Sequence, residues 1–71
     1  MKKSILIEFG HAAREQRTKL GYSQEELAES AGLHRTYIGM IERAEKNITL
    51  ENISKLAKAL NLKICELFNK I

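Results

Sequence analysis

The stretch from Ser23 to Arg43, SQEELAESAGLHRTYIGMIER, decides how this chain folds. It opens with Ser-Gln-Glu-Glu, a capping-box pattern in which the serine accepts a backbone amide and the last glutamate reaches back to the serine amide. Gly32 then interrupts the helical pattern at a point that suits a tight turn. Beyond it, a second helix begins at His34 or Arg35, with apolar residues again at helical spacing. The stretch therefore predicts two short helices joined by a bend.

The sequence before this stretch predicts one longer helix, because its apolar residues follow the helical period and do not alternate as in a strand. The inner face of this helix comprises Ile5, Phe9, Ala13, Arg17 and Leu20. Gly21 follows it and suits a left-handed C-terminal cap. Gly10 lies inside it and should weaken it by roughly 1 kcal/mol relative to alanine.

The sequence after the central stretch predicts two more helices. Thr49 can cap the first of them, and Asn61 can end it in the left-handed conformation. A last helix is expected at about 63–69. The inner faces of these two helices comprise Leu50, Ile53, Leu56, Ala57, Leu60, Ile64, Leu67, Phe68 and Ile71. The whole pattern predicts an all-α fold of five helices.

Length and composition restrict the class of protein. The 71 residues make a single domain, 1–71, and a chain this short buries only about 60% of its unfolded surface, which favours dimerisation. A net charge of +3 and a pI of about 9.2 permit nucleic-acid binding. Cys65 is the one cysteine; it excludes an intrachain disulfide, and its spacing predicts a buried or half-buried apolar role. The apolar run near the start ends at Glu8, too soon for a signal peptide or membrane span, so a cytoplasmic location is expected.

Residues that could catalyse a reaction or hold a metal are scattered. His11 and His34 lie in different expected helices, and surface exposure is the simpler reading of each. Glu25, Glu26 and Glu29 crowd one helix, where capping and surface roles are more ordinary than acid–base chemistry. We therefore expect no enzyme activity, no metal, no cofactor and no small-molecule ligand.

The two central helices form the pattern that points to a function. In a DNA-binding helix-turn-helix, the second helix enters the major groove and its first residues contact base edges. Arg35 can donate two hydrogen bonds to guanine, and the methyl group of Thr36 can contact thymine. Gly39, one turn further, would let the helix lie close to DNA, and Met40 can offer only apolar contact. The alternative is a merely solvated helix start.

Several runs resemble one known family, in the order in which they occur from Arg14 to Leu60. They are Arg17 through GYSQEELA (21–28), Ala31-Gly32-Leu33, Ile38, Ile41-Glu42-Arg43 and LAKAL (56–60). The chain resembles the lambda-repressor-like helix-turn-helix family, also called the XRE or Cro/CI family. Residues 34–60 look most like the controller proteins of restriction–modification systems. The resemblance implies a five-helix DNA-binding domain, with the helix-turn-helix at about 23–43.

The resemblance also implies roles for individual residues on the DNA side. Gln24 would contact a phosphate and brace the recognition helix. Arg43 and Lys46 would contact the DNA backbone or an adjacent groove, although a solvated cation near a helix end is the simpler alternative. Tyr37 would either offer its hydroxyl to a phosphate or pack half-buried. Asn47 would bind a phosphate or shape the loop.

A structural pair and two departures from the family pattern complete this reading. Arg17 and Glu42 would form a partly buried ion pair between the first and third helices. Ala44 replaces the glycine that is common after Ile-Glu-Arg, so the third helix could continue or end differently. His34 occupies a capping position for which histidine is a poor residue.

The expected dimer surface lies in the C-terminal part, at about 48–71. Its candidate residues are Ile48, Leu50, Leu67, Phe68 and Ile71, each of which could instead belong to the core. The sequence thus predicts a homodimeric transcription regulator that binds a palindromic operator in double-stranded DNA, in the manner of a restriction–modification controller. An antitoxin-type or phage-type repressor that also acts through protein–protein binding is the alternative.

Overall fold

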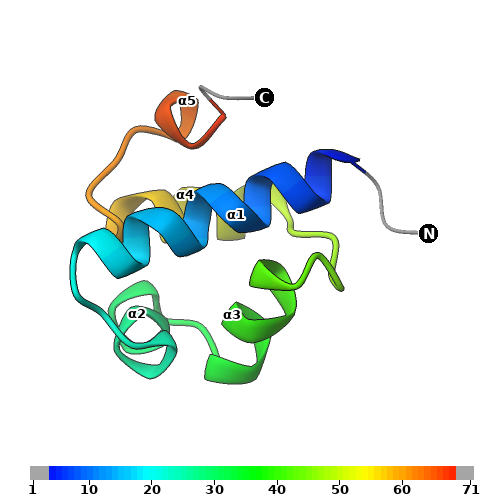
Figure 1. Ribbon diagram of the computed structural model, residues 1–71. Helices are drawn as coiled ribbons and strands as arrows, with labels where there is room; N and C mark the ends of the chain where they lie inside the picture. Colours follow the sequence, from blue (N-terminus) through cyan, green and yellow to red (C-terminus); the bar gives the residue numbers. More distant parts are fainter. Residues whose placement is uncertain (1–3, 69–71) are drawn as a thin grey trace.

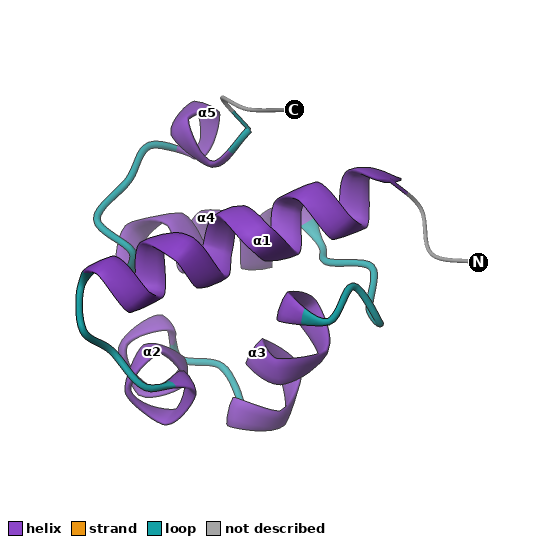
Figure 2. Cartoon of the chain, in the orientation of Figure 1, coloured by secondary structure: helices purple, strands orange, loops and turns teal. Residues whose placement is uncertain are grey.

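Every regular element in residues 4–68, the part of the chain that the structure describes, is a helix. The computed structural model contains α1 (Ser4–Lys19), α2 (Gln24–Ala31), α3 (Arg35–Glu42), α4 (Leu50–Ala59) and α5 (Ile64–Leu67). Figure 1 shows α1 crossing the middle of the molecule, with α2 and α3 on one side of it and α5 on the other. The colouring by secondary structure in Figure 2 shows loops as the only connections. The predicted all-α, five-helix fold is confirmed.

The helix boundaries follow the local signals in the sequence. Ser23 Oγ accepts from the Glu26 amide at 3.0 Å, and Glu26 Oε1 accepts from the Ser23 amide at 2.8 Å, which completes the capping box. Gly32 ends α2 with a φ of 69°, in the left-handed region. Thr49 caps α4 through its side chain, and Asn61 follows α4 with a φ of 60°. These four ends are as predicted.

The core lies where α1 passes over the other helices. Its buried members are Phe9, Ala13, Leu27, Ala28, Ile38, Ile41, Leu56, Ala57, Leu60 and Leu67. Gly10 lies at the closest approach of α1 to α3, where an added Cβ would be 2.6 Å from the backbone oxygen of Ile41. Our view of Gly10 as only a weak point of α1 is therefore incomplete, because the absent side chain allows the two helices to touch.

Several expectations about the helices need correction, and among them Leu20 and Ile64, expected on inner faces, are 37% and 38% exposed. α5 is shorter than predicted and ends at Leu67, while Asn69 lies outside the described residues. Cys65 is exposed and not buried. Ile5 and Leu50 are 51% and 75% exposed, so neither belongs to the inner face of its helix. Both lie in the first turn of a helix, where the chain is only beginning to pack against its neighbours.

Candidate nucleic-acid interface

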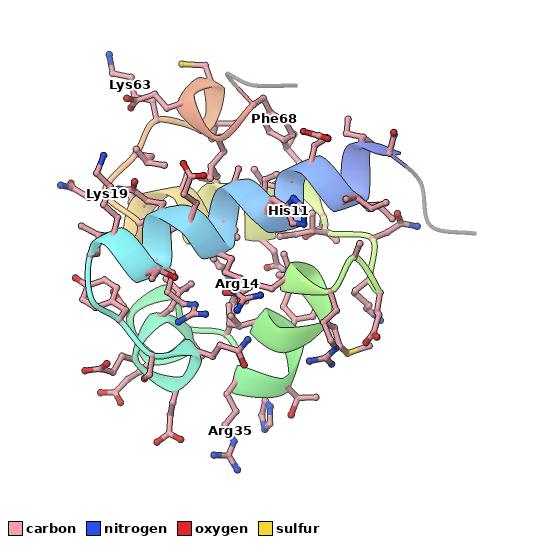
Figure 3. All side chains as sticks on the ribbon, in the orientation of Figure 1. His11, Arg14, Lys19, Arg35, Lys63 and Phe68 are labelled. Carbon is pink, nitrogen blue, oxygen red and sulfur yellow. The ribbon has the colours of Figure 1, made fainter. Side chains whose placement is uncertain are left out.

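The beginning of α3 projects into solvent. Arg35 and Thr36 are both exposed, and Figure 3 shows Arg35 extending away from the body of the protein. His34 caps the helix, because its Nδ1 accepts a hydrogen bond from the Thr36 amide at 3.2 Å. His34 therefore supplies the side-chain cap of α3, although histidine is not among the preferred capping residues.

The first turn of α2 lies beside this projecting end. Glu25 Oε2 accepts a hydrogen bond from Arg35 Nη1 at 2.9 Å. A shallow groove runs between the two helix starts, and its lining residues are Arg17, Ser23, Gln24, Glu25, Arg35, Thr36, Gly39 and Arg43. Three of these carry a guanidinium group and one carries a carboxylate. Each of the three guanidinium groups is ion-paired with a glutamate, namely Glu42, Glu25 or Glu45, so the groove offers cationic hydrogen-bond donors whose charge is balanced within the protein.

Glu42, at the other end of α3, ties three elements together. Arg17 of α1 donates to it from Nε at 2.7 Å and from Nη2 at 3.1 Å, and a third guanidinium nitrogen bonds the Tyr22 carbonyl at 2.8 Å. The side chains of Arg17 and Glu42 are only 14% and 3% exposed. Hydrogen bonding to Glu42 raises the pKa of Arg17 above its ordinary value, although desolvation opposes this. The pair expected from the sequence is thus a partly buried, bidentate contact.

Gln24 joins the same cluster. Its Nε2 donates to Glu42 Oε1 at 3.0 Å, so the first residue of α2 braces the last residue of α3. Gly39 lies buried next to it, and a Cβ there would be 3.5 Å from Gln24 Oε1 and 3.0 Å from Arg43 Nη1. A close approach of α3 to DNA at Gly39 stays a prediction. The glycine makes room for the Gln24 and Arg43 side chains, which cover it.

Tyr37 occupies the half-buried packing position that was one of its two expected roles. Its hydroxyl accepts a hydrogen bond from Asn52 Nδ2, in the first turn of α4, at 3.2 Å. Sequence reasoning missed Asn52, which looks like any polar residue near a helix start. A contact between Tyr37 and a phosphate stays a prediction.

The loop after α3 carries the remaining polar candidates. α3 ends at Glu42, and Ala44 takes a φ of 59°, so alanine adopts the conformation that glycine would favour here. The replacement therefore does not extend the helix. Arg43, Lys46 and Asn47 are exposed, and Arg43 Nε donates to Glu45 Oε1 at 3.0 Å.

The candidate dimer residues fall into different environments. Leu67 is 1% exposed and belongs to the core, so its side chain is not available to a partner. Phe68 is half-buried, with its ring centroid 5.1 Å from that of Phe9, and Ile48 is half-buried against the core. Leu50, at 75%, is the most exposed of the large apolar side chains described. Ile71 lies outside the described residues.

The described residues contain neither a candidate membrane span nor a candidate metal-binding cluster. Between residues 4 and 68, no helix has the length and apolar character needed to cross a bilayer. Within the same range, no three His, Cys, Asp or Glu side chains come together as metal ligands would.

The short α2, the left-handed turn at Gly32 and the projecting α3 define a helix-turn-helix protein. The helix-turn-helix family model matches residues 14–67. Control protein C.SmaI of Serratia marcescens is 48% identical over 68 residues, which are 96% of this chain and 77% of that protein. The crystal structure of the restriction-modification controller protein C.AhdI from Aeromonas hydrophila shares 48% identity at a TM-score of 0.91, over 93% of this chain and 100% of that one.

A further solved structure shows such a protein on its operator. The restriction-modification controller protein C.Esp1396I, 29% identical with a TM-score of 0.89, was solved as a tetramer with its natural 35 base-pair operator. The match covers 96% of this chain and 90% of that one. This chain belongs to the helix-turn-helix family and, within it, to the restriction–modification controller proteins.

Proposed function

We propose that this protein is a sequence-specific transcription regulator that binds an operator in double-stranded DNA as a homodimer and controls a restriction–modification system. The observation that carries the proposal is the exposed pair Arg35 and Thr36 at the beginning of α3, beside a groove lined by arginines. The relatives support it, since C.Esp1396I is a controller protein solved on its operator. Regulation by occupancy of DNA needs no bond chemistry, cofactor or membrane, and a cytoplasmic location suits it.

The proposed docking places the beginning of α3 in the major groove. Arg35 would then donate to guanine O6 and N7, and the Thr36 methyl would contact thymine. Phosphate contacts would come from both sides of the helix. Gln24 lies on one side, at the start of α2, and Arg43, Lys46 and Asn47 lie on the other, in the loop after α3. Tyr37 would contribute only if its hydroxyl left Asn52.

The proposed dimer joins two copies through the C-terminal half. Leu50 supports this placement because an apolar side chain that is 75% exposed gains most from a partner. Ile48 and Phe68 are the half-buried neighbours that remain candidates. Two copies related by a twofold axis would present their α3 helices to half-sites roughly 34 Å apart, which explains a palindromic operator.

The test of DNA recognition is a binding titration with a duplex from the region upstream of the protein's own gene and a scrambled duplex of equal length. Arg35→Ala should weaken binding to the upstream duplex by about 1–3 kcal/mol and relax the preference at one base position. Lys46→Ala should weaken binding to both duplexes by the same factor. It should also reduce the slope of log K against log salt concentration by about one. If Arg35→Ala leaves sequence preference unchanged, the base-reading assignment is wrong.

The test of the dimer is sedimentation of Leu50→Glu beside the wild type. The exposed position predicts an intact fold, a shift from dimer to monomer and weaker operator binding, because the introduced charge would be buried against its symmetry mate. A variant that remains dimeric at the same concentration would place the dimer surface elsewhere.

A further inference from the structure

The ion pair between Arg35 and Glu25 joins the tip of the recognition helix to the neighbouring helix. Arg35 is the first residue of α3 and Glu25 the second residue of α2, and 2.9 Å separates Nη1 from Oε2. Both side chains are 69% exposed. The inference below rests on the proposed function, since it concerns how Arg35 reads a base.

Folding does not explain this contact. Ion pairs as exposed as this one contribute little to stability. Glu25 is not needed for the capping box either, because Glu26 accepts the Ser23 amide. An acidic group in the first turn favours the helix, but Glu26 supplies one as well. Glu25 thus places a carboxylate at the edge of a groove lined by three arginines without a strong structural reason.

The geometry of the contact leaves Arg35 able to bind a base. Glu25 occupies Nη1, whereas the edge formed by Nε and Nη2 keeps its donors for guanine O6 and N7. A free arginine side chain loses rotamer freedom when it binds. Glu25 reduces that loss because it holds the guanidinium before DNA arrives.

The charge of Glu25 acts in a second way. On an unrelated sequence, Arg35 could bind only phosphate, and the carboxylate would compete with that phosphate for the guanidinium group. We propose that Glu25 is a positioning residue that presents Arg35 to guanine and disfavours DNA without the operator sequence.

The experiment measures binding of the full chain to the upstream duplex and to the scrambled duplex at two salt concentrations. Glu25→Ala should weaken operator binding by up to about fivefold, the upper range for an exposed ion pair. It should tighten binding to the scrambled duplex by roughly twofold to fivefold, and this gain should shrink at high salt. The ratio of operator to scrambled binding then falls by a factor between about two and about 25.

Two further variants separate charge from geometry. Glu25→Gln keeps an oxygen that can accept from Arg35 but removes the charge, so operator binding should be retained while scrambled binding tightens. Glu29→Ala is the matched control, because Glu29 is also exposed on α2 but does not line the groove. It should change binding to both duplexes by the same small factor and leave selectivity at the wild-type value.

A double-mutant cycle decides whether Glu25 acts through Arg35. In the Arg35→Ala background, Glu25→Ala should no longer weaken operator binding. Persistence of the same loss there, or unchanged selectivity in Glu25→Ala alone, would overturn the inference while the proposed function stands. A wild-type chain that binds both duplexes equally would overturn the proposed function, and the inference with it.

Discussion

The two ends of α3 each carry an arginine–glutamate pair, and the two pairs differ in nearly everything except chemistry. Glu42 is the last residue of α3, and its Oε2 lies 2.7 Å from Nε of Arg17 in α1. The side chains of Arg17 and Glu42 are 14% and 3% exposed. At the first residue, Arg35 and Glu25 are 2.9 Å apart, and both side chains are 69% exposed. Contact distance alone would rank these pairs as equals.

Burial gives the two pairs different roles. The Glu42 side chain is almost shielded from solvent and is held by Arg17 and Gln24, so removal of a partner would leave its charge largely uncompensated. Arg35 and Glu25 keep most of their hydration, so a ligand can replace their contact at small cost. The C-terminal end of α3 is therefore held in place by its ion pair. At the N-terminal end, a ligand can replace the ion pair, as recognition of an external partner requires.

The largest effect should come from Arg17→Ala, which leaves the Glu42 carboxylate buried without its main counter-charge. We expect a loss of about 3–5 kcal/mol in the free energy of unfolding, measured by urea denaturation. The double variant Arg17→Ala/Glu42→Ala is the control and should lose less than the two single variants together, because no charge is left unpaired. Wild-type stability in Arg17→Ala would show that the Arg17–Glu42 ion pair is more hydrated than its exposed fractions indicate.

Gly10→Ala should disrupt the contact between α1 and the C-terminal end of α3 by steric overlap. The new Cβ would meet backbone oxygens of Ile41 and Glu42 at 2.6 and 2.9 Å, and neither can rotate away. We expect a loss of about 1–3 kcal/mol from overpacking, larger than the gain in helix propensity. The matched variant is Gly39→Ala, whose nearest neighbour is the flexible end of Arg43 at 3.0 Å. If thermal unfolding shows both variants equally destabilised, close approach is not the reason for Gly10.

Local signals in the sequence were enough to predict where α2 and α4 begin and end. Ser23, Gly32, Thr49 and Asn61 each act within a few residues of themselves, and all four occupy the expected ends. The pairing of Arg17 with Glu42 lies beyond such signals, because 25 residues separate the partners. It was expected only because the chain resembles a known family.

The contacts that escaped prediction depend on how whole helices pack. The Glu25–Arg35 pair forms because α2 packs against α3, and the Asn52–Tyr37 pair forms because the first turn of α4 reaches the Tyr37 hydroxyl; neither pairing has a spacing rule. Leu50 and Cys65 fit a helical stripe, yet both are exposed, because periodicity does not say how far the neighbouring helix extends. Ala44 shows that tertiary packing can impose a left-handed φ on a residue that does not favour it.

Ser23→Ala tests the capped first turn of α2, which contacts both ion pairs of α3. The capped first turn of α2 carries Gln24, which bonds Glu42, and Glu25, which bonds Arg35. Loss of the hydroxyl should cost about 1 kcal/mol of stability, because the Glu26 amide loses its acceptor. Ser30→Ala, exposed within the same helix, is the control and should be neutral or slightly stabilising. Equal effects in denaturant titrations would mean that the cap contributes nothing.

The smallest effect should be that of Arg35→Ala on folding. An ion pair with both side chains 69% exposed should change the free energy of unfolding by less than about 0.5 kcal/mol, because water replaces each lost contact. The measurement is the urea midpoint of Arg35→Ala beside that of Arg17→Ala, in low and high salt. A loss of unfolding free energy close to that of Arg17→Ala would mean that the ion pair at the N-terminal end of α3 contributes as much to stability as the one at its C-terminal end. A near-zero change in the free energy of unfolding would mean that Arg35 does not stabilise the fold. A large effect of the same substitution on DNA binding would then be due to recognition alone.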